Sequence, residues 1–214
     1  MFPTTPLHAR IPVKALTSQG NRFDVACRMI KTALNYRARL VLFFGDQGKK
    51  YGVSRISVDG TKIDDGINNR LNSELHVARF IIDAITSNDG LCDPCMPCVG
   101  ITIETYHEMD SETDSFIQEL QDFKERSAMK VILLHEDGIP ALVTEQGRIR
   151  WSRHDIHDSI FVLGDHLGFR LPVENKLKEI VDDILCISTG PLNGAKNNIS
   201  YLGSHVIAFI SMMR

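Results

Sequence analysis

A chain of 214 residues, 43% hydrophobic and 24% charged, has the balance of an ordinary globular protein and is long enough to bury a real core. Its net charge of −3 argues against a protein that coats nucleic acid through an overall positive field, although local basic faces remain compatible with it. No apolar run approaches the ~20 residues that span a bilayer, and residues 1–14 lack the apolar core of a signal peptide, so we expect a cytoplasmic protein.

The beginning of the chain predicts two strands with a helix between them. Residues 8–16 are expected to form a strand. A helix is expected over residues 21–36, because Val25, Met29 and further apolar residues recur there at helical spacing. The short apolar run at residues 40–44 ends at a glycine, which is typical of a buried strand.

An alternating segment followed by a glycine turn predicts a small β-hairpin. Residues 53–58 alternate between apolar and polar side chains, and Asp59-Gly60 is a strong hairpin-turn signal that leads into residues 61–63. We therefore expect a hairpin near residues 53–63 that decorates the main sheet. A second amphipathic helix is expected at residues 73–86.

The second half of the chain alternates short apolar strands with helices. This order favours a mostly parallel sheet covered by helices on both faces, within a single domain over residues 1–214. The expected strands are residues 99–105, 131–134, 160–163 and 184–188, and the expected helices are residues 111–125, 173–183 and 199–212.

Three of the five cysteines lie close together, in a loop near residues 90–98. In a cytosolic chain the spacing of Cys92, Cys95 and Cys98 suggests a metal before a disulfide. A structural zinc site needs four ligands, and His107 could supply the fourth. The alternative, which we favour, is a proline-stiffened loop that holds no metal.

Three strand ends in the second half carry loops of similar character, at residues 134–138, 163–168 and 188–192. If the three strands are parallel neighbours, these loops meet in one crevice of backbone groups and little charge, which suits a nucleoside better than a triphosphate. The sequence contains neither a phosphate-loop motif nor a dinucleotide fingerprint. Two alternatives stay open: loops that only turn the chain, with Asp165 as a helix cap, or a metal pair of His135 and His166.

Charged residues open the first expected helix. Arg22, Asp24 and Arg28 can form a helix cap and a salt bridge of little energetic weight. Alternatively, the two arginines face a phosphate and Asp24 faces a substrate nitrogen. The residues alone favour neither interpretation over the other. The same choice, between RNA contact and solvated surface, applies to two loose basic groups: Arg37, Arg39, Lys49, Lys50 and Arg55, and Arg148, Arg150 and Arg153.

Several segments together resemble one known family. Residues 161–169 (Phe-Val-Leu-Gly-Asp-His-Leu-Gly-Phe), 188–192 (Ser-Thr-Gly-Pro-Leu) and 200–206 (Ser-Tyr-Leu-Gly-Ser-His-Val) closely resemble the archaeal tRNA pseudouridine(54) N1-methyltransferases. These enzymes belong to the SPOUT superfamily, which uses S-adenosylmethionine. Residues 20–28, at the start of the first helix, are similar to that family's Gly-Arg-x-Asp segment.

The resemblance implies a fold, a cofactor and partners. The fold is α/β, a SPOUT-type parallel sheet with helices on both faces and a C-terminal trefoil knot. In this family the knot loops bind S-adenosyl-L-methionine and the enzyme works as a homodimer. The resemblance therefore implies N1-methylation of pseudouridine in tRNA, with RNA and a second copy of the chain as partners, and neither DNA nor a membrane.

The resemblance also implies which residues form the site. Asp24 would orient or deprotonate N1, while Arg22 and Arg28 would hold an RNA phosphate or stabilise the developing anion. The donor-binding positions, most of which would act through backbone groups, are Leu134, Gly164, Thr189, Gly190, Pro191, Leu192, Ser200, Tyr201 and Val206.

The chain departs from the family at three places. Residues 193–199 are inserted before the Ser-Tyr-Leu segment, Val206 stands where the family often has cysteine, and the C-terminal tail differs. Two alternatives therefore stay open. One is a SPOUT methyltransferase that acts on rRNA or on another tRNA nucleotide, and the other is a non-catalytic RNA-binding assembly factor.

Overall fold

The computed structural model divides into two compact units, Met1–Glu112 and Thr113–Arg214. The single domain expected from the sequence stays a prediction, because compact units can belong to one domain. The expected strand at residues 8–16, the cysteine loop and His107 lie outside the described residues. The structure describes residues 23–44, 53–86, 100–105, 112–145, 148–151, 158–164, 169, 171–187 and 203–212.

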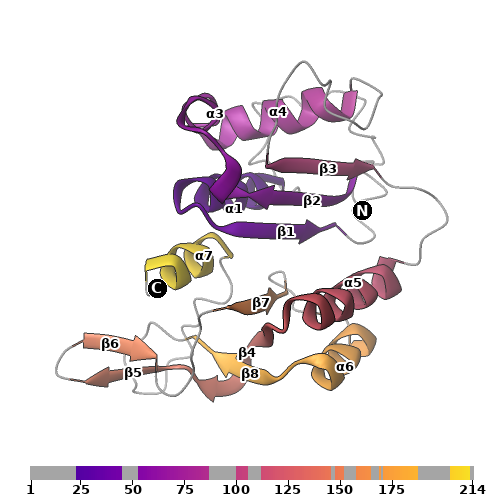
Figure 1. Cartoon of the computed structure of the whole chain (residues 1–214), viewed down its shortest axis with the longest axis vertical. Coiled ribbons are helices and arrows are strands. Elements are labelled where there is room, and N and C mark those ends of the chain that lie inside the picture. Colours follow the sequence, from indigo (N-terminus) through magenta and orange to yellow (C-terminus); the bar gives the residue numbers. More distant parts are fainter. Residues whose placement is uncertain are drawn as a thin grey trace, which may run out of the picture. The chain divides into compact units, whose positions relative to one another are not determined.

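The first unit contains a three-stranded antiparallel sheet with the strand order β1-β2-β3 (Figure 1). The mostly parallel sheet expected for the whole chain is therefore wrong for this unit. Apolar side chains from one face of the sheet form a common core with the helices. The elements are α1 (Phe23–Asn35), β1 (Arg39–Phe43), β2 (Val53–Asp59), the 3₁₀ helix η2 (Gly60–Lys62), α3 (Asp65–Arg70), α4 (Glu74–Thr86) and β3 (Ile101–Thr105).

Helix α1 forms because its apolar residues recur every three or four positions and lie on one side. That side is buried in the core of the first unit. A large apolar side chain that is fully buried contributes about 1.5–3 kcal/mol to the free energy of folding. The residues of α1 that are at most 2% exposed are Phe23, Cys27, Ile30, Ala33 and Leu34.

The end of α1 is closed by a left-handed residue. The backbone nitrogen of Ala38 donates to the carbonyl oxygen of Ala33 at 2.8 Å, and Arg37 between them has a φ of 51°. This is the Schellman pattern, in which the residue after the helix takes the left-handed conformation that glycine adopts most easily. Arginine at this position therefore carries backbone strain.

The β-hairpin expected near residues 53–63 is wrong. Strand β2 runs to Asp59, and the chain then enters the 3₁₀ helix η2 instead of a second hairpin strand. Gly60 serves a close approach: its backbone nitrogen donates to the oxygen of Ala38 at 3.0 Å, and a Cβ on Gly60 would lie 2.7 Å from the oxygen of Ala33. Glycine is required here by the neighbouring end of α1, and not by a hairpin turn.

Two side chains start the next helices. Asp64 caps α3 by accepting a hydrogen bond from the nitrogen of Ile67 at 2.8 Å. The helix α3 itself was not expected from the sequence. Ser73 caps α4 in the same way, because its Oγ accepts from the nitrogen of His76 at 3.2 Å. These caps place α4 one short turn after α3.

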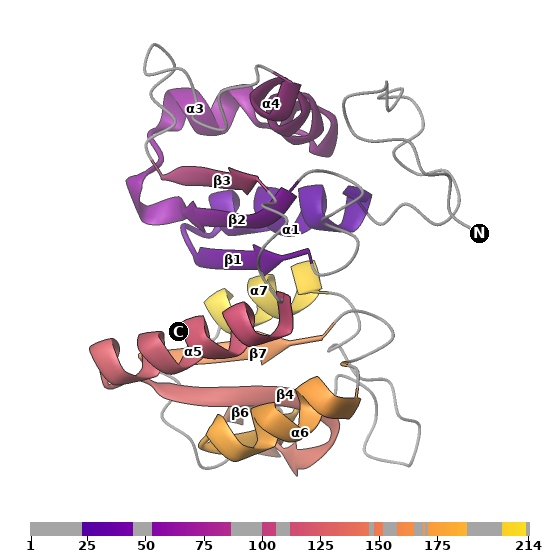
Figure 2. The same cartoon turned by 90° about the vertical axis from the view of Figure 1, so that its right-hand side faces the viewer.

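The second unit centres on a three-stranded parallel sheet with the strand order β7-β4-β8. Helices α5 and α6 cover one face, which Figure 2 shows in front, and α7 packs on the other. The expected parallel sheet with helices on both faces is confirmed for this unit. Its elements are α5 (Glu112–Ser127), β4 (Lys130–Pro140), β5 (Leu142–Glu145), β6 (Arg148–Trp151), β7 (Ser159–Leu163), α6 (Leu171–Ile180), β8 (Asp183–Cys186) and α7 (Gly203–Met212).

The central strand β4 shows why this sheet was readable from the sequence. Val131 and Leu133 belong to the core beneath α5 and α6, whereas Ile132 and Leu134 belong to the core beneath α7. All four are at most 3% exposed. A strand buried on both faces needs an unbroken apolar run, which the sequence has here.

One part of this unit was not expected from the sequence, and another expected part cannot be compared with the described residues. Strands β5 and β6 form an antiparallel pair that the sequence analysis missed. The trefoil knot would involve the loops after β7 and β8, at residues 165–168 and 188–202, which lie outside the described residues. Within the described ranges, no helix is both long enough and apolar enough to cross a membrane.

Candidate functional site

Leu134 of β4 lies between the carboxyl ends of β7 and β8. Leu134 of β4 is paired in register with Leu163 of β7 and with Leu185 of β8, and both neighbours are parallel to β4. The condition that we set for a shared crevice, three parallel neighbouring strands, is therefore met. Open α/β sheets bind ligands at this edge, where loops leave the carboxyl ends of their strands.

Three of the expected donor-binding positions lie in the described part of this unit. Leu134 and Val206 are 3% and 4% exposed and belong to one apolar cluster between β4 and α7. Gly164 follows Leu163 at the end of the neighbouring strand. The positions that lie outside the described residues are Thr189, Gly190, Pro191, Leu192, Ser200 and Tyr201.

Strand β4 does not end at Leu134, as the sequence predicts, but forms a bulge and continues. Leu134 and Ile139 both pair with Leu185 of β8, so residues 135–138 loop out between two limbs of the same strand. Gly138 lies directly against β8, because a Cβ there would lie 2.5 Å from the carbonyl carbon of Leu185. We call residues 135–138 the β4 bulge.

The side chain of His135 links the β4 bulge to α6. Its Nδ1 accepts a hydrogen bond from the backbone nitrogen of Asp137 at 3.2 Å, and its Nε2 lies 3.6 Å from Oε1 of Glu174. A hydrogen bond from Lys178 lowers the pKa of Glu174, and the nearby His135 adds a smaller effect in the same direction. Glu174 is therefore a carboxylate at neutral pH.

From the sequence, His135 was expected in a strand-end loop and as one half of a possible metal pair, whereas Glu174 was not expected at the site. His166, the other member of that pair, and Asp165, the expected helix cap, lie outside the described residues. No spacing rule connects His135 with Glu174, since they come from a strand and from a separate helix. The link depends on how α6 packs against β4.

In the first unit, Arg28 joins α1 to α4. Its Nε donates to Oε1 of Glu74 at 2.9 Å, and its Nη2 donates to Oε2 of the same carboxylate at 3.5 Å. The same Nη2 lies 3.9 Å from Oδ2 of Asp24, one turn earlier on α1. The hydrogen bond to Glu74 raises the pKa of Arg28 above its ordinary value. Arg22 lies outside the described residues.

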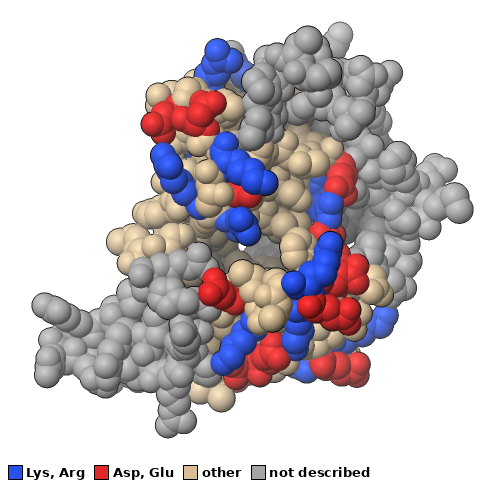
Figure 3. Space-filling view, viewed as in Figure 1, with Lys and Arg blue, Asp and Glu red and all other residues tan. Residues whose placement is uncertain are grey.

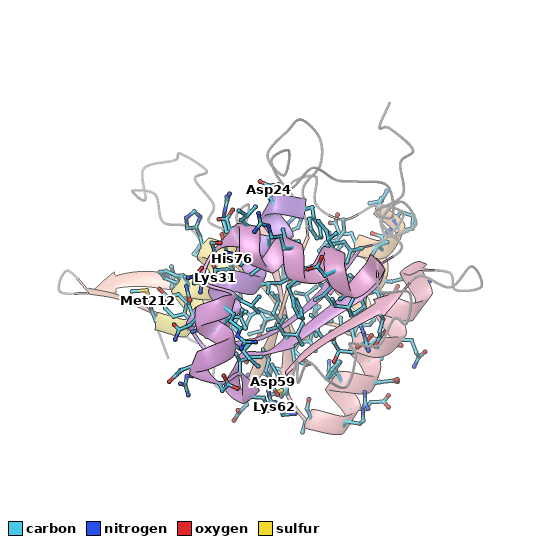
Figure 4. All side chains as sticks on the ribbon, turned by 90° about the horizontal axis from the view of Figure 1, so that it is seen from above. Asp24, Lys31, Asp59, Lys62, His76 and Met212 are labelled. Carbon is cyan, nitrogen blue, oxygen red and sulfur yellow. The ribbon has the colours of Figure 1, made fainter. Side chains whose placement is uncertain are left out.

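This arrangement contains the salt bridge of the structural alternative and keeps Asp24 accessible. The side chain of Asp24 is 23% exposed and lies in the first turn of α1, where the helix dipole favours a carboxylate. Figure 4 shows Asp24 at one side of the first unit, far from Asp59 and Lys62. An RNA phosphate that bound Arg28 would compete with Glu74 for its guanidinium.

The first loose basic group of the sequence is largely neutralised. Each of its described arginines pairs with a carboxylate, and Figure 3 shows basic and acidic side chains interspersed on the face in view. A local positive surface is correspondingly weakened. The pairs are Arg37–Asp65 at 3.4 Å, Arg39–Asp59 at 3.5 Å and Arg55–Glu104. Lys49, Lys50, Arg153 and the side chains of Arg148 and Arg150 lie outside the described residues.

Comparison with known proteins identifies no relative. No protein-family model matches the chain, and no curated protein matches it at a significant level. Membership of the family that the motifs resemble therefore stays a prediction.

Proposed function

We propose that the chain is an S-adenosylmethionine-dependent RNA methyltransferase that methylates N1 of pseudouridine in tRNA. The observation that carries the proposal is that the ends of β7 and β8 flank Leu134 of β4 in register. The motifs that resemble the methyltransferase family begin in β7 and directly after β8, at residues 161–169 and 188–192. The proposal includes a SPOUT-type knot formed by the loops after β7 and β8 and a homodimer as the working form.

The chemical character of this edge supports a nucleoside ligand. The expected donor-binding positions that the structure describes are apolar or lack a side chain, namely Leu134, Gly164 and Val206. Such a site binds through backbone groups and shape, which suits the adenosine part of the donor. The donor supplies a methyl group on a positively charged sulfur.

The proposed reaction needs a proton acceptor and an aligned nucleophile. When N1 of pseudouridine takes the methyl group, the N1 proton leaves and the donor departs as a neutral thioether. Asp24 would accept or orient that proton, and Arg28 would hold the RNA backbone. In-line alignment of N1 with the methyl group can supply several kcal/mol of the rate enhancement.

Donor binding is the first test of this proposal. Titration calorimetry with S-adenosylmethionine should show a saturable site. The variant Gly164→Ala should raise the dissociation constant for the donor by about tenfold or more, because the added methyl group occupies space that the donor needs. Gly66→Ala, on α3 in the first unit, is the matched control and should bind as the wild type does. Absence of a saturable site in the wild type would remove the proposal.

Transfer of the methyl group is the second test. Mass spectrometry of nucleosides from tRNA and rRNA, after incubation with the protein and the donor, should show new N1-methylpseudouridine in tRNA. Methylation of rRNA or of another tRNA nucleotide would support the other SPOUT activity. Donor binding without transfer to either RNA would support a non-catalytic assembly factor.

The role of Asp24 has its own test. Asp24→Asn should lower kcat by about a hundredfold or more, because general acid–base groups contribute on this scale. Asp65→Asn is the control, since Asp65 is an exposed carboxylate of the same unit that pairs with Arg37. Unchanged turnover in Asp24→Asn would leave that residue a purely structural role.

A further inference from the structure

The β4 bulge follows directly after Leu134, and its conformation depends on one imidazole. We propose that His135 is a positioning residue that sets the donor-binding edge by tying the β4 bulge to α6. This inference rests on the proposed function, because it assigns the bulge to the donor site. His135 itself is not assigned a contact with the donor.

One nitrogen of the His135 ring, Nδ1, is hydrogen-bonded within the bulge, and the other, Nε2, lies close to α6. Because Nδ1 accepts from the backbone nitrogen of Asp137, the neutral ring carries its proton on Nε2. That proton faces Oε1 of Glu174, 3.6 Å from Nε2. The side chain of His135 therefore closes a local turn within the bulge through Nδ1 and places Nε2 beside α6.

The partner on α6 is itself held in place. The side chain of Glu174 is 18% exposed, and the ammonium group of Lys178, one helical turn later, binds the same oxygen that faces His135. The carboxylate of Glu174 therefore lies beside the imidazole while it is paired with Lys178. A second described carboxylate, that of Asp137, has its Oδ2 at 3.9 Å from Nδ1 of His135.

The rest of the bulge is already fixed by β8. Leu134 and Ile139 pair with the same residue, Leu185, and Gly138 lies too close to β8 for any side chain. The imidazole restrains the backbone between His135 and Asp137 through its hydrogen bond with the nitrogen of Asp137. A change there acts on Leu134, whose backbone is one of the expected donor contacts.

Two variants separate the two contacts of the ring. In His135→Asn, the shorter side chain can still accept from the nitrogen two residues later, as asparagine does in Asx turns, but it cannot reach Glu174. Glu174→Gln removes the charge and leaves His135 in place. His135→Ala removes both contacts. His76→Ala is the matched control, because His76 is an exposed histidine of the first unit.

The experiment combines amide hydrogen exchange at Asp137 with donor binding. His135→Ala should increase exchange at Asp137 and weaken donor binding by about tenfold or more, raising the KM for the donor with little change in kcat. His135→Asn should restore protection at Asp137 and recover most of the affinity. Glu174→Gln should produce a smaller loss of affinity, and His76→Ala should produce none.

Three results would overturn the inference. They are donor affinity in His135→Ala equal to that of the wild type, loss of affinity in His135→Asn as large as in His135→Ala, and unchanged exchange at Asp137 in His135→Ala. If the wild type binds no donor, the proposed function fails and the assignment of the bulge fails with it. In that event the exchange data still show whether His135 holds the bulge, so the two failures are distinguishable.

Discussion

Two hydrogen bonds join the backbone of Val131 to Asp182 at the start of the parallel sheet. The nitrogen of Val131 donates to Oδ2 of Asp182 at 2.8 Å, and the nitrogen of Asp182 donates to the oxygen of Val131 at 2.8 Å. Nζ of Lys124, on α5, donates to Oδ1 of Asp182 and to the oxygen of Ile180, both at 2.7 Å. One carboxylate therefore ties together β4, β8 and α5.

The first prediction concerns the pH dependence of this tie. Burial raises the pKa of Asp182, but the hydrogen bonds from Lys124 and Val131 outweigh it and bring the pKa below its ordinary value of 3.8. The stabilisation is therefore fully present above the ordinary carboxylate range and is lost as the pH falls through the lowered pKa. Asp182→Asn should reduce the free energy of unfolding at pH 7 by about 1 kcal/mol.

Urea denaturation at pH 7 and near pH 3 measures this effect. The difference between the wild type and Asp182→Asn should shrink in acid. Glu179→Gln, an exposed carboxylate on α6, serves as the control and should show little difference at either pH. A difference that stays constant with pH would mean that the charge of Asp182 does not stabilise the fold.

The second prediction concerns Gly138 in the β4 bulge. Gly138→Ala should lower the free energy of unfolding by about 1–3 kcal/mol, since its methyl group would meet the backbone of β8. The carbonyl carbon of Leu185 lies 2.5 Å from the position of that methyl group. Chemical denaturation checks this against Gly66→Ala within α3, where the added Cβ would lie 3.1 Å from the side-chain oxygen Oδ1 of Asp64 and would meet no backbone atom, so its loss of stability should be smaller. Equal stability of Gly138→Ala and the wild type would mean that the bulge can move away from β8.

The third prediction concerns the left-handed residue after α1. Arg37→Gly should raise the free energy of unfolding by about 0.5–1 kcal/mol, because glycine adopts a φ of 51° without steric cost. Arg37→Ala keeps the strain and removes the exposed ion pair with Asp65, so it should not stabilise. Thermal unfolding of both variants separates the backbone effect from the ion pair, and stabilisation by alanine as large as that by glycine would contradict the prediction.

The fourth prediction concerns Arg28 and Glu74. Their side chains are 40% and 42% exposed, so we expect a coupling free energy of only about 0.5–1 kcal/mol from a double-mutant cycle of Arg28→Ala and Glu74→Ala. The coupling should fall as salt is added, because exposed ion pairs are screened. A coupling near zero at low salt would mean that Glu74 does not restrain Arg28.

Elements whose patterns are local were predictable from the sequence. Helix α1 has apolar residues at a regular helical spacing, and β4, β7 and β8 are short apolar runs that end at turn residues. The pairing of β2 with β3 was not predictable, because it joins strands that are separated by two helices. Asp59-Gly60 led to the wrong prediction of a hairpin, because a glycine required for close packing has the same sequence signal as a glycine required for a turn.

The candidate site divides in the same way. The end of β7 at Leu163 was predictable, because an apolar run marks it, and so was its place beside Leu134 in a parallel sheet. The continuation of β4 to Pro140 was not predictable, because the bulge after Leu134 has no sequence signal that we recognised. The contacts of His135 with Glu174 and of Arg28 with Glu74 were not predictable either. Each joins residues of separate elements, and no spacing along the chain carries information about how those elements pack.

Each unit of the fold contains a buried thiol. Cys27 is 0% exposed in the core of the first unit, and its burial raises the thiol pKa to about 12; Cys186 is 8% exposed at the end of β8 in the second. Alkylating reagents attack the exposed thiolate, so such a cysteine becomes reactive when its surroundings open. Mass spectrometry of the two labelled peptides would then time the opening of each unit separately, and equal rates would indicate that the two halves of the chain unfold together.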